Sequence, residues 1–123
     1  MAQNNRQFYF NFKIWIEDDM HNSILGDGKW QLLKAIDETG SLKDAMIQMD
    51  LTYRKTWDNL RRIEQKLGFP IIETERGGAD GGRTVLSPQG KKIVALFDDF
   101  HQQVDVQLKE IAKKFSQQIA DIV

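Results

Sequence analysis

The sequence contains no cysteine and only two histidines in 123 residues. Without cysteine the chain cannot form a disulfide, a thiolate metal site or a thiol nucleophile, and two separate histidines cannot supply a histidine-rich zinc centre. We therefore expect no cofactor and a cytoplasmic location. The sequence also lacks an apolar run of roughly 20 residues, the length of a membrane span, and lacks a basic start followed by an apolar core, so we expect neither a membrane segment nor export.

Neither sign of charge is in large excess, because 17 Lys and Arg stand against 18 Asp and Glu. This balance excludes a strongly basic, histone-like protein, and the hydrophobic content of 41% is enough for one core. The charges are nevertheless unevenly distributed: residues 1–51 hold 5 basic and 8 acidic side chains, 52–92 hold 9 and 5, and 93–123 hold 3 and 5. Nucleic-acid binding would therefore depend on a local basic patch in the middle segment.

The first third of the chain predicts one strand and one helix. Residues 8–17 alternate between apolar and polar side chains, which is typical of a half-buried β-strand. Trp15 falls on the polar face of that strand, where it is either an exposed ring or a dimer contact. A polar, glycine-bearing segment follows at 18–27, and apolar residues at helical spacing then predict a helix over about 28–39.

Two further helices are predicted with a tight turn between them. Ser41 and Asp44 have the spacing of a capping box, which opens a second helix that ends near Met49. We expect Asp50 to take a positive φ in the turn and Leu51 to pack inward.

The third helix is predicted to run from the N-cap residue Thr52 to Leu67, before Gly68. An apolar stripe that includes Trp57 would seat this helix on the core and leave its polar side chains facing outward. Residues 52–62 hold four basic side chains and one acidic one. A basic helix by itself is more often a solvated face, so it is the helix-turn-helix layout with a following hairpin that favours contact with duplex DNA.

A β-hairpin and a long helix are predicted for the rest of the chain. Residues 71–75 and 83–86 flank a glycine-rich loop, which indicates a hairpin. Ser87 and Pro88 form an N-cap and first-turn pair, and apolar residues then recur about every 3.6 positions, which predicts a helix over about 88–121. That helix would be roughly 50 Å long, beyond the diameter of a small domain, so its far half is expected to pair with a second copy in a homodimer.

Several motifs resemble one family. Gly40-Ser41-Leu42, Thr52-Tyr53-Arg54-Lys55-Thr56-Trp57-Asp58 and Leu86-Ser87-Pro88-Gln89-Gly90 are similar to the N-terminal DNA-binding domain of molybdate-responsive ModE-type regulators. LysR-type regulators share the Gly-Ser pair, the run at 61–68 and the start of the last helix. Tyr53, the Trp57-Asp58 pair and the N-terminal strand favour the ModE type.

The resemblance implies an α+β, mostly α fold, in which a winged helix-turn-helix over 1–87 precedes a C-terminal dimerisation helix over 88–123. The N-terminal strand would join the wing sheet, and the third helix would enter the major groove of double-stranded DNA. Asp80 in the wing would oppose a phosphate, with only Arg76 and Arg83 at the wing's two ends to offset it. The residues expected to contact DNA are Ser41, Thr52, Tyr53, Arg54, Lys55, Asn59, Arg76 and Arg83.

The resemblance leaves two functions open. Full-length members of that family continue into modules that bind molybdate, and no such region follows Val123 in this sequence, so we expect no small-molecule ligand within this chain. The favoured function is a dimeric DNA-binding transcriptional regulator. The alternative is a winged-helix protein-interaction module that does not bind DNA, which the near-neutral charge would allow.

Enzyme activity is not expected. Asp98, Asp99 and His101 on the last helix have no nucleophile or paired base beside them in the sequence. The acidic residues at 17–19 together with His21 are better explained as a solvated strand end than as a metal site, because consecutive residues of an extended chain point in opposite directions.

Overall fold

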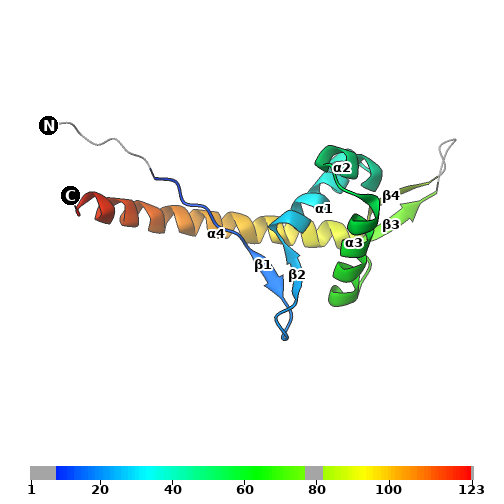
Figure 1. Cartoon of the computed structure of the whole chain (residues 1–123), viewed down its shortest axis with the longest axis horizontal. Coiled ribbons are helices and arrows are strands. Elements are labelled where there is room, and N and C mark those ends of the chain that lie inside the picture. The colour runs from blue at the N-terminus through cyan, green and yellow to red at the C-terminus, as the bar shows by residue number, and fades with distance from the viewer. Residues whose placement is uncertain (1–7, 77–81, 123) are drawn as a thin grey trace. The chain divides into compact units, whose positions relative to one another are not determined.

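The computed structural model describes residues 8–76 and 82–122, and it is mostly helical with short strands, as predicted (Figure 1). None of the helices in these residues is long and apolar enough to cross a membrane. The elements, in chain order, are β1 (Trp15–Glu17), β2 (Ser23–Gly26), α1 (Asp27–Thr39), α2 (Leu42–Met49), α3 (Tyr53–Leu67), β3 (Ile72–Glu75), β4 (Arg83–Leu86) and α4 (Pro88–Ala120).

The chain divides into two compact units. The first, Lys13–Phe97, contains both hairpins, α1, α2, α3 and the first part of α4. The second combines Met1–Phe12 with Asp98–Val123 and so contains the rest of α4.

The core of the first unit gathers apolar side chains from every one of its helices. Trp30 of α1 packs against Phe97 of α4, with the ring centroids 5.2 Å apart. Because each helix presents a single apolar face, three short helices and two hairpins can enclose one core. Its fully buried apolar residues include Leu25, Leu33, Ile36, Leu42, Leu60, Ile63 and Ile71.

The predicted bounds of α1, α2 and α3 are confirmed to within a residue, and the predicted cap at Ser41 is present. The Ser41 hydroxyl accepts a hydrogen bond from the Asp44 backbone N–H at 3.1 Å. Asp50 takes the expected positive φ of 53°. The prediction that Leu51 packs inward was wrong, because its side chain is 40% exposed. The turn fixes only its backbone, whose N–H donates to the Met46 carbonyl at 2.9 Å.

The N-terminal half departs from the predicted strand pattern. Only Trp15–Glu17 of the expected strand over 8–17 is extended and paired, and its partner is β2 at Ser23–Gly26, a strand that was not predicted. The expectation that this strand joins the sheet of the second hairpin was also wrong, since β1–β2 and β3–β4 form separate two-stranded sheets. A partner only a few residues away closes the hairpin with a small loss of chain entropy, which favours the local pairing.

The second hairpin and the start of α4 are confirmed. Ile72 pairs with Leu86 and Glu75 pairs with Arg83, so β3 and β4 are in register over their whole length. The intervening tip, which includes Asp80, lies outside the described residues.

Ser87 joins the beginning of α4 to the segment before β3. Its hydroxyl donates to the Pro70 carbonyl at 2.6 Å and accepts from the Gly90 N–H at 2.9 Å. A Cβ on Gly90 would collide with the Ile71 carbonyl oxygen, so the helix can approach this closely only because residue 90 is glycine.

Candidate nucleic-acid interface

The outward face of α3 carries the basic residues that the sequence placed there. Arg54 and Lys55 are exposed in its first turn, and within the described residues neither forms an ion pair with an acid. The inward face is formed by Thr56, Leu60 and Ile63, which are all buried. The orientation predicted for this helix is therefore confirmed.

Two details of α3 differ from the prediction. Trp57 is half-buried, packed against the edge of the core rather than inside it. Thr56 is buried instead, and its hydroxyl donates to the Thr52 carbonyl one turn earlier at 2.7 Å. Such back-bonding lets a threonine occupy an inward position, which is why a stripe drawn from apolar residues alone missed it. Thr52 precedes the helix as expected, but its side chain makes no capping hydrogen bond.

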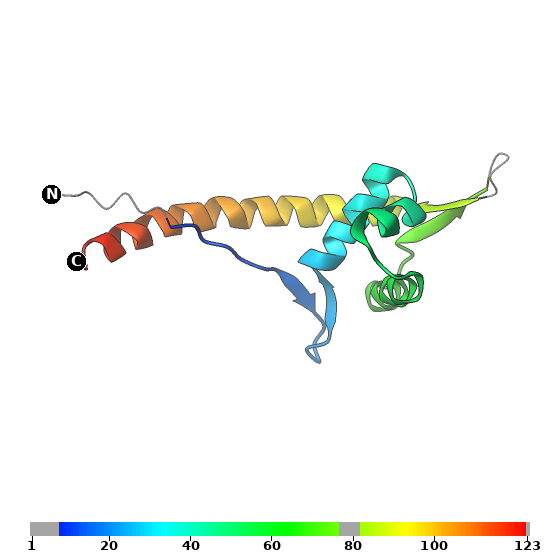
Figure 2. The ribbon, with the colours of Figure 1, turned by 45° about the horizontal axis from the view of Figure 1, so that its top comes forward.

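Three of the predicted residues, Ser41, Tyr53 and Arg83, meet in one groove of about 650 Å³. The groove is bounded by the start of α2, the first turns of α3 and the strand β4. Lys43 and Trp57 also line it, and Lys43 was not among the predicted contact residues. Figure 1 and Figure 2 both show the β3–β4 hairpin projecting beyond α3.

The other predicted residues lie outside this groove. Arg54 and Lys55 are on the exposed side of α3, and Asn59 is half-buried one turn later. Arg76 is exposed immediately after β3.

The Arg83 side chain has protein partners within the described residues. Its Nε donates to the Glu75 carboxylate on the paired strand at 3.2 Å. A Cβ built on Gly40 would lie 3.7 Å from Arg83 Nη1, which places the guanidinium beside the junction of α1 and α2.

A further cation was missed because it comes from a distant part of the sequence. Burial, and then the charge of Arg62 on α3, lower the pKa of Lys29 at the start of α1. The charge of Arg62 on α3 therefore acts on Lys29 of α1, which brings a cation of α1 within electrostatic range of α3. Nothing in the local pattern around residue 29 could have signalled this, because the two residues are 33 positions apart in the sequence.

The acidic cluster near the first hairpin serves a structural purpose. Asp18 accepts hydrogen bonds from Lys66 Nζ at 2.8 Å and from the N–H groups of Met20 and Asn22. The Lys66 ammonium and these backbone donors lower the pKa of Asp18 to about 2. Within the described residues, no group of three or more His, Cys, Asp or Glu side chains is arranged to hold a metal ion.

The second unit presents an apolar helix face. Phe100, Ile111 and Phe115 of α4 are exposed, and at 3.6 residues per turn they fall within an arc of about 60°. Residues 8–12 lie along the neighbouring flank of the helix, where Phe10 packs edge-on against Phe115 with centroids 5.6 Å apart.

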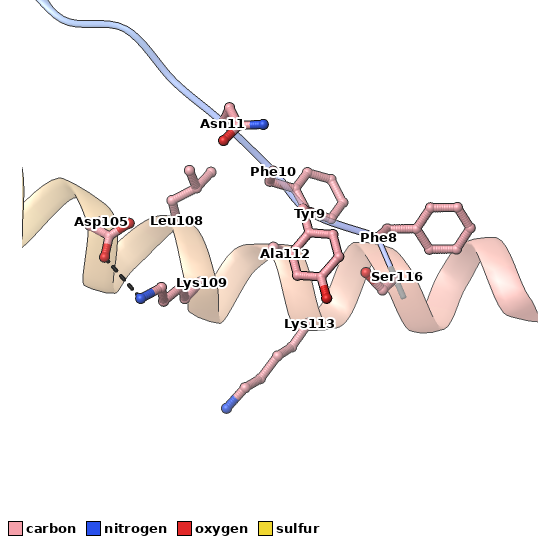
Figure 3. Close-up of a pocket in the computed structure, with 10 residues that line it drawn as sticks. All are labelled: Phe8, Tyr9, Phe10, Asn11, Asp105, Leu108, Lys109, Ala112, Lys113 and Ser116. Carbon is pink, nitrogen blue, oxygen red and sulfur yellow. Dashed lines mark ion pairs between the residues drawn. The ribbon is translucent and has the colours of Figure 1, made fainter. Parts of the chain in front are cut away.

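A hollow of about 710 Å³ remains between this segment and the helix (Figure 3). The aromatic rings of Phe8, Tyr9 and Phe10 lie on one side of it, and Leu108 and Ala112 lie on the other.

Comparison with known proteins identifies relatives of this chain. No family model matches the sequence. The molybdenum-pterin-binding protein MopB of Rhodobacter capsulatus is 29% identical over 99 residues, which cover 80% of this chain and 37% of that protein. The molybdenum transport protein ModE of Azotobacter vinelandii is 26% identical over 95 residues, covering 77% and 35%. The transcriptional regulator ModE of Haemophilus influenzae is 31% identical over 89 residues, covering 72% and 35%. The chain thus spans little more than a third of the length of these relatives.

Proposed function

Because the chain is a homologue of ModE transcriptional regulators over their N-terminal region, we propose that it is a winged helix-turn-helix module that binds double-stranded DNA in the regulation of transcription. In this proposal α3 lies in the major groove and the β3–β4 hairpin acts as the wing. The observation that carries it is the meeting of Ser41, Tyr53 and Arg83 in one groove beside the outward Arg54 and Lys55.

The charge distribution supports this assignment. The segment 52–92 holds 9 basic and 5 acidic side chains, in a chain whose net charge is −1. Acidic surface elsewhere would turn away from the phosphates and so orient the molecule as it approaches DNA. Phosphate contacts would fix the position of α3, and its first turn would then reach the base edges.

The apolar face of α4 supports a second part of the proposal, a homodimer formed through this helix. In a monomer, Phe100, Ile111 and Phe115 would leave large apolar side chains exposed to water along one face of the helix, and gathered apolar exposure marks interaction sites. A two-fold dimer would present two copies of α3 and therefore favour an operator with two related half-sites.

Selection of bound sites from a random duplex pool tests the proposal. We expect one enriched motif with two half-sites, bound with an affinity that falls steeply as salt rises. If the purified chain enriches no sequence and shows no salt-dependent binding to any duplex, the alternative of a protein-interaction module is favoured. The exposed apolar side chains of Ile47, Leu51 and Tyr53 around the turn would then be the surface to examine.

A further inference from the structure

Glu64, in the C-terminal half of α3, makes contacts in two directions. Its Oε2 accepts hydrogen bonds from the backbone N–H of Ile71 at 2.8 Å and of Ile72 at 3.3 Å, at the start of β3. Its Oε1 accepts from Arg61 Nη1 at 3.0 Å. The Glu64 side chain is only 10% exposed and its two hydrogen bonds to β3 are partly buried, where charge-assisted bonds are stronger than in water, whereas the Arg61 side chain is 64% exposed.

The contacts continue from Arg61 to the groove. The Arg61 guanidinium lies over the ring of Trp57, 5.2 Å from its centroid, and Trp57 in turn meets Tyr53 at 5.9 Å. Tyr53 and Trp57 form the α3 wall of the groove that Arg83 borders from β4. Because β4 is paired with β3 in register, hydrogen bonds that hold the start of β3 also help to hold Arg83.

We propose that Glu64 is a positioning residue, which sets the placement of the β3–β4 hairpin relative to α3 and thereby the separation of the two walls of the groove. Glu64 itself would not touch DNA. This inference rests on the proposed function, because it assigns Glu64 a role in presenting the DNA-binding surface. If Glu64 only stabilised the fold, replacing it would lower the melting temperature, and its effect on DNA affinity would not depend on whether the hairpin still contacts DNA.

The first test compares two substitutions with the same change of charge. Glu64→Gln removes the ion pair with Arg61 and weakens the bonds to β3, whereas Glu73→Gln removes the charge of an exposed carboxylate on β3 itself. Charge alone predicts that both variants bind DNA slightly more tightly, since each loses a negative charge. We expect Glu64→Gln instead to bind DNA roughly tenfold more weakly than the wild type, whereas Glu73→Gln should bind DNA at least as tightly.

A double-mutant cycle separates positioning from stabilisation. If Glu64 acts by placing the hairpin, Glu64→Gln adds little to the loss caused by Arg83→Ala, because the hairpin contact is already gone. When Glu64→Gln is combined with Lys55→Ala, whose side chain lies on α3 alone, the two fold-losses of DNA affinity should multiply, as expected for independent effects. The proposal would be overturned if the fold-losses of DNA affinity multiplied in both cycles. It would also be overturned if the Glu64→Gln variant bound DNA as tightly as Glu73→Gln.

Amide hydrogen exchange gives a readout that does not depend on DNA. In Glu64→Gln we expect the amides of Ile71 and Ile72 to exchange at least roughly tenfold faster, while the core amide of Leu33 changes little. If the wild-type chain binds no duplex but these two amides respond, the proposed function has failed and the structural link stands. If the exchange rates of both amides are unchanged, Glu64 does not hold the start of β3 and the structural link is wrong. Should Glu64→Gln fail to fold, Glu64→Asp, which keeps the charge on a shorter side chain, replaces it in each measurement, and Glu73→Asp then replaces Glu73→Gln as its control.

Discussion

Replacing Ile111 with Asp provides the strongest test of dimerisation through α4. Burying an isoleucine side chain is worth about 1.5 to 3 kcal/mol. Since 64% of Ile111 is exposed, each protomer would lose about 1 to 2 kcal/mol and the dimer about 2 to 4 kcal/mol. This corresponds to a rise of roughly 30- to 1,000-fold in the dimer dissociation constant, before the cost of burying two carboxylates is added.

Val106 supplies the matched control for this substitution. It is 56% exposed, similar to Ile111, but lies about 140° away around a helix of 3.6 residues per turn. Val106→Asp should therefore leave the dimer intact. Sedimentation velocity should report a wild-type mass of about 29 kDa, twice that of the 14.3 kDa chain, and a monomer for Ile111→Asp. A wild-type monomer at tens of micromolar, or equal dissociation by both variants, would refute the reasoning.

Three further outcomes are expected. Arg54→Ala should weaken specific DNA binding by about 1 to 3 kcal/mol without changing the melting temperature. Trp57→Ala should instead destabilise the fold by about 1 to 3 kcal/mol, which is below the range for a fully buried ring. The reverse pattern in binding and melting assays would mean that α3 is rotated. The pKa of Asp18, about 2, is below its usual value of 3.8, so the contribution of this carboxylate to stability is present above pH 3.8 and is lost as the pH falls toward 2. Lys66→Ala should raise this pKa in an NMR titration, and an unchanged pKa would exclude the ion pair as the cause of the shift. Calorimetry with molybdate should show no saturable heat, and micromolar binding linked to DNA affinity would reveal a sensor in this chain.

The helices could be predicted because their signals are local. The capping pair at Ser41 and Asp44, the glycines at 40 and 68, and the Ser87-Pro88 start each act within one turn of a helix end. The alternation of residues 8–17 is local too, but a strand also needs a partner. Pairing is limited to Trp15–Glu17 because β2 itself extends over only four residues, so most of the alternating segment has no neighbouring strand.

Long-range contacts account for what the sequence could not supply. The neighbouring charges of Lys29 and Arg62, and the bonds from Glu64 to the amides of Ile71 and Ile72, depend on how the elements pack. The family resemblance named Ser41 and Arg83 separately, but only the fold brings them into one groove. Glu64 carried no signal as a single residue, because an acid in a basic helix is also expected as an ordinary surface residue.

The close approach of Gly90 to Ile71 limits how far this chain can be truncated and still fold. Ser87 and Gly90 hold the start of α4 against the segment before β3, and Val94 and Phe97 of the same helix are buried in the core of the first unit. A fragment ending at residue 87 would therefore lose two core side chains and leave Trp30 without its aromatic neighbour. The shortest fragment able to fold independently must retain the first turns of α4 through Phe97, even if its only task is to present α3.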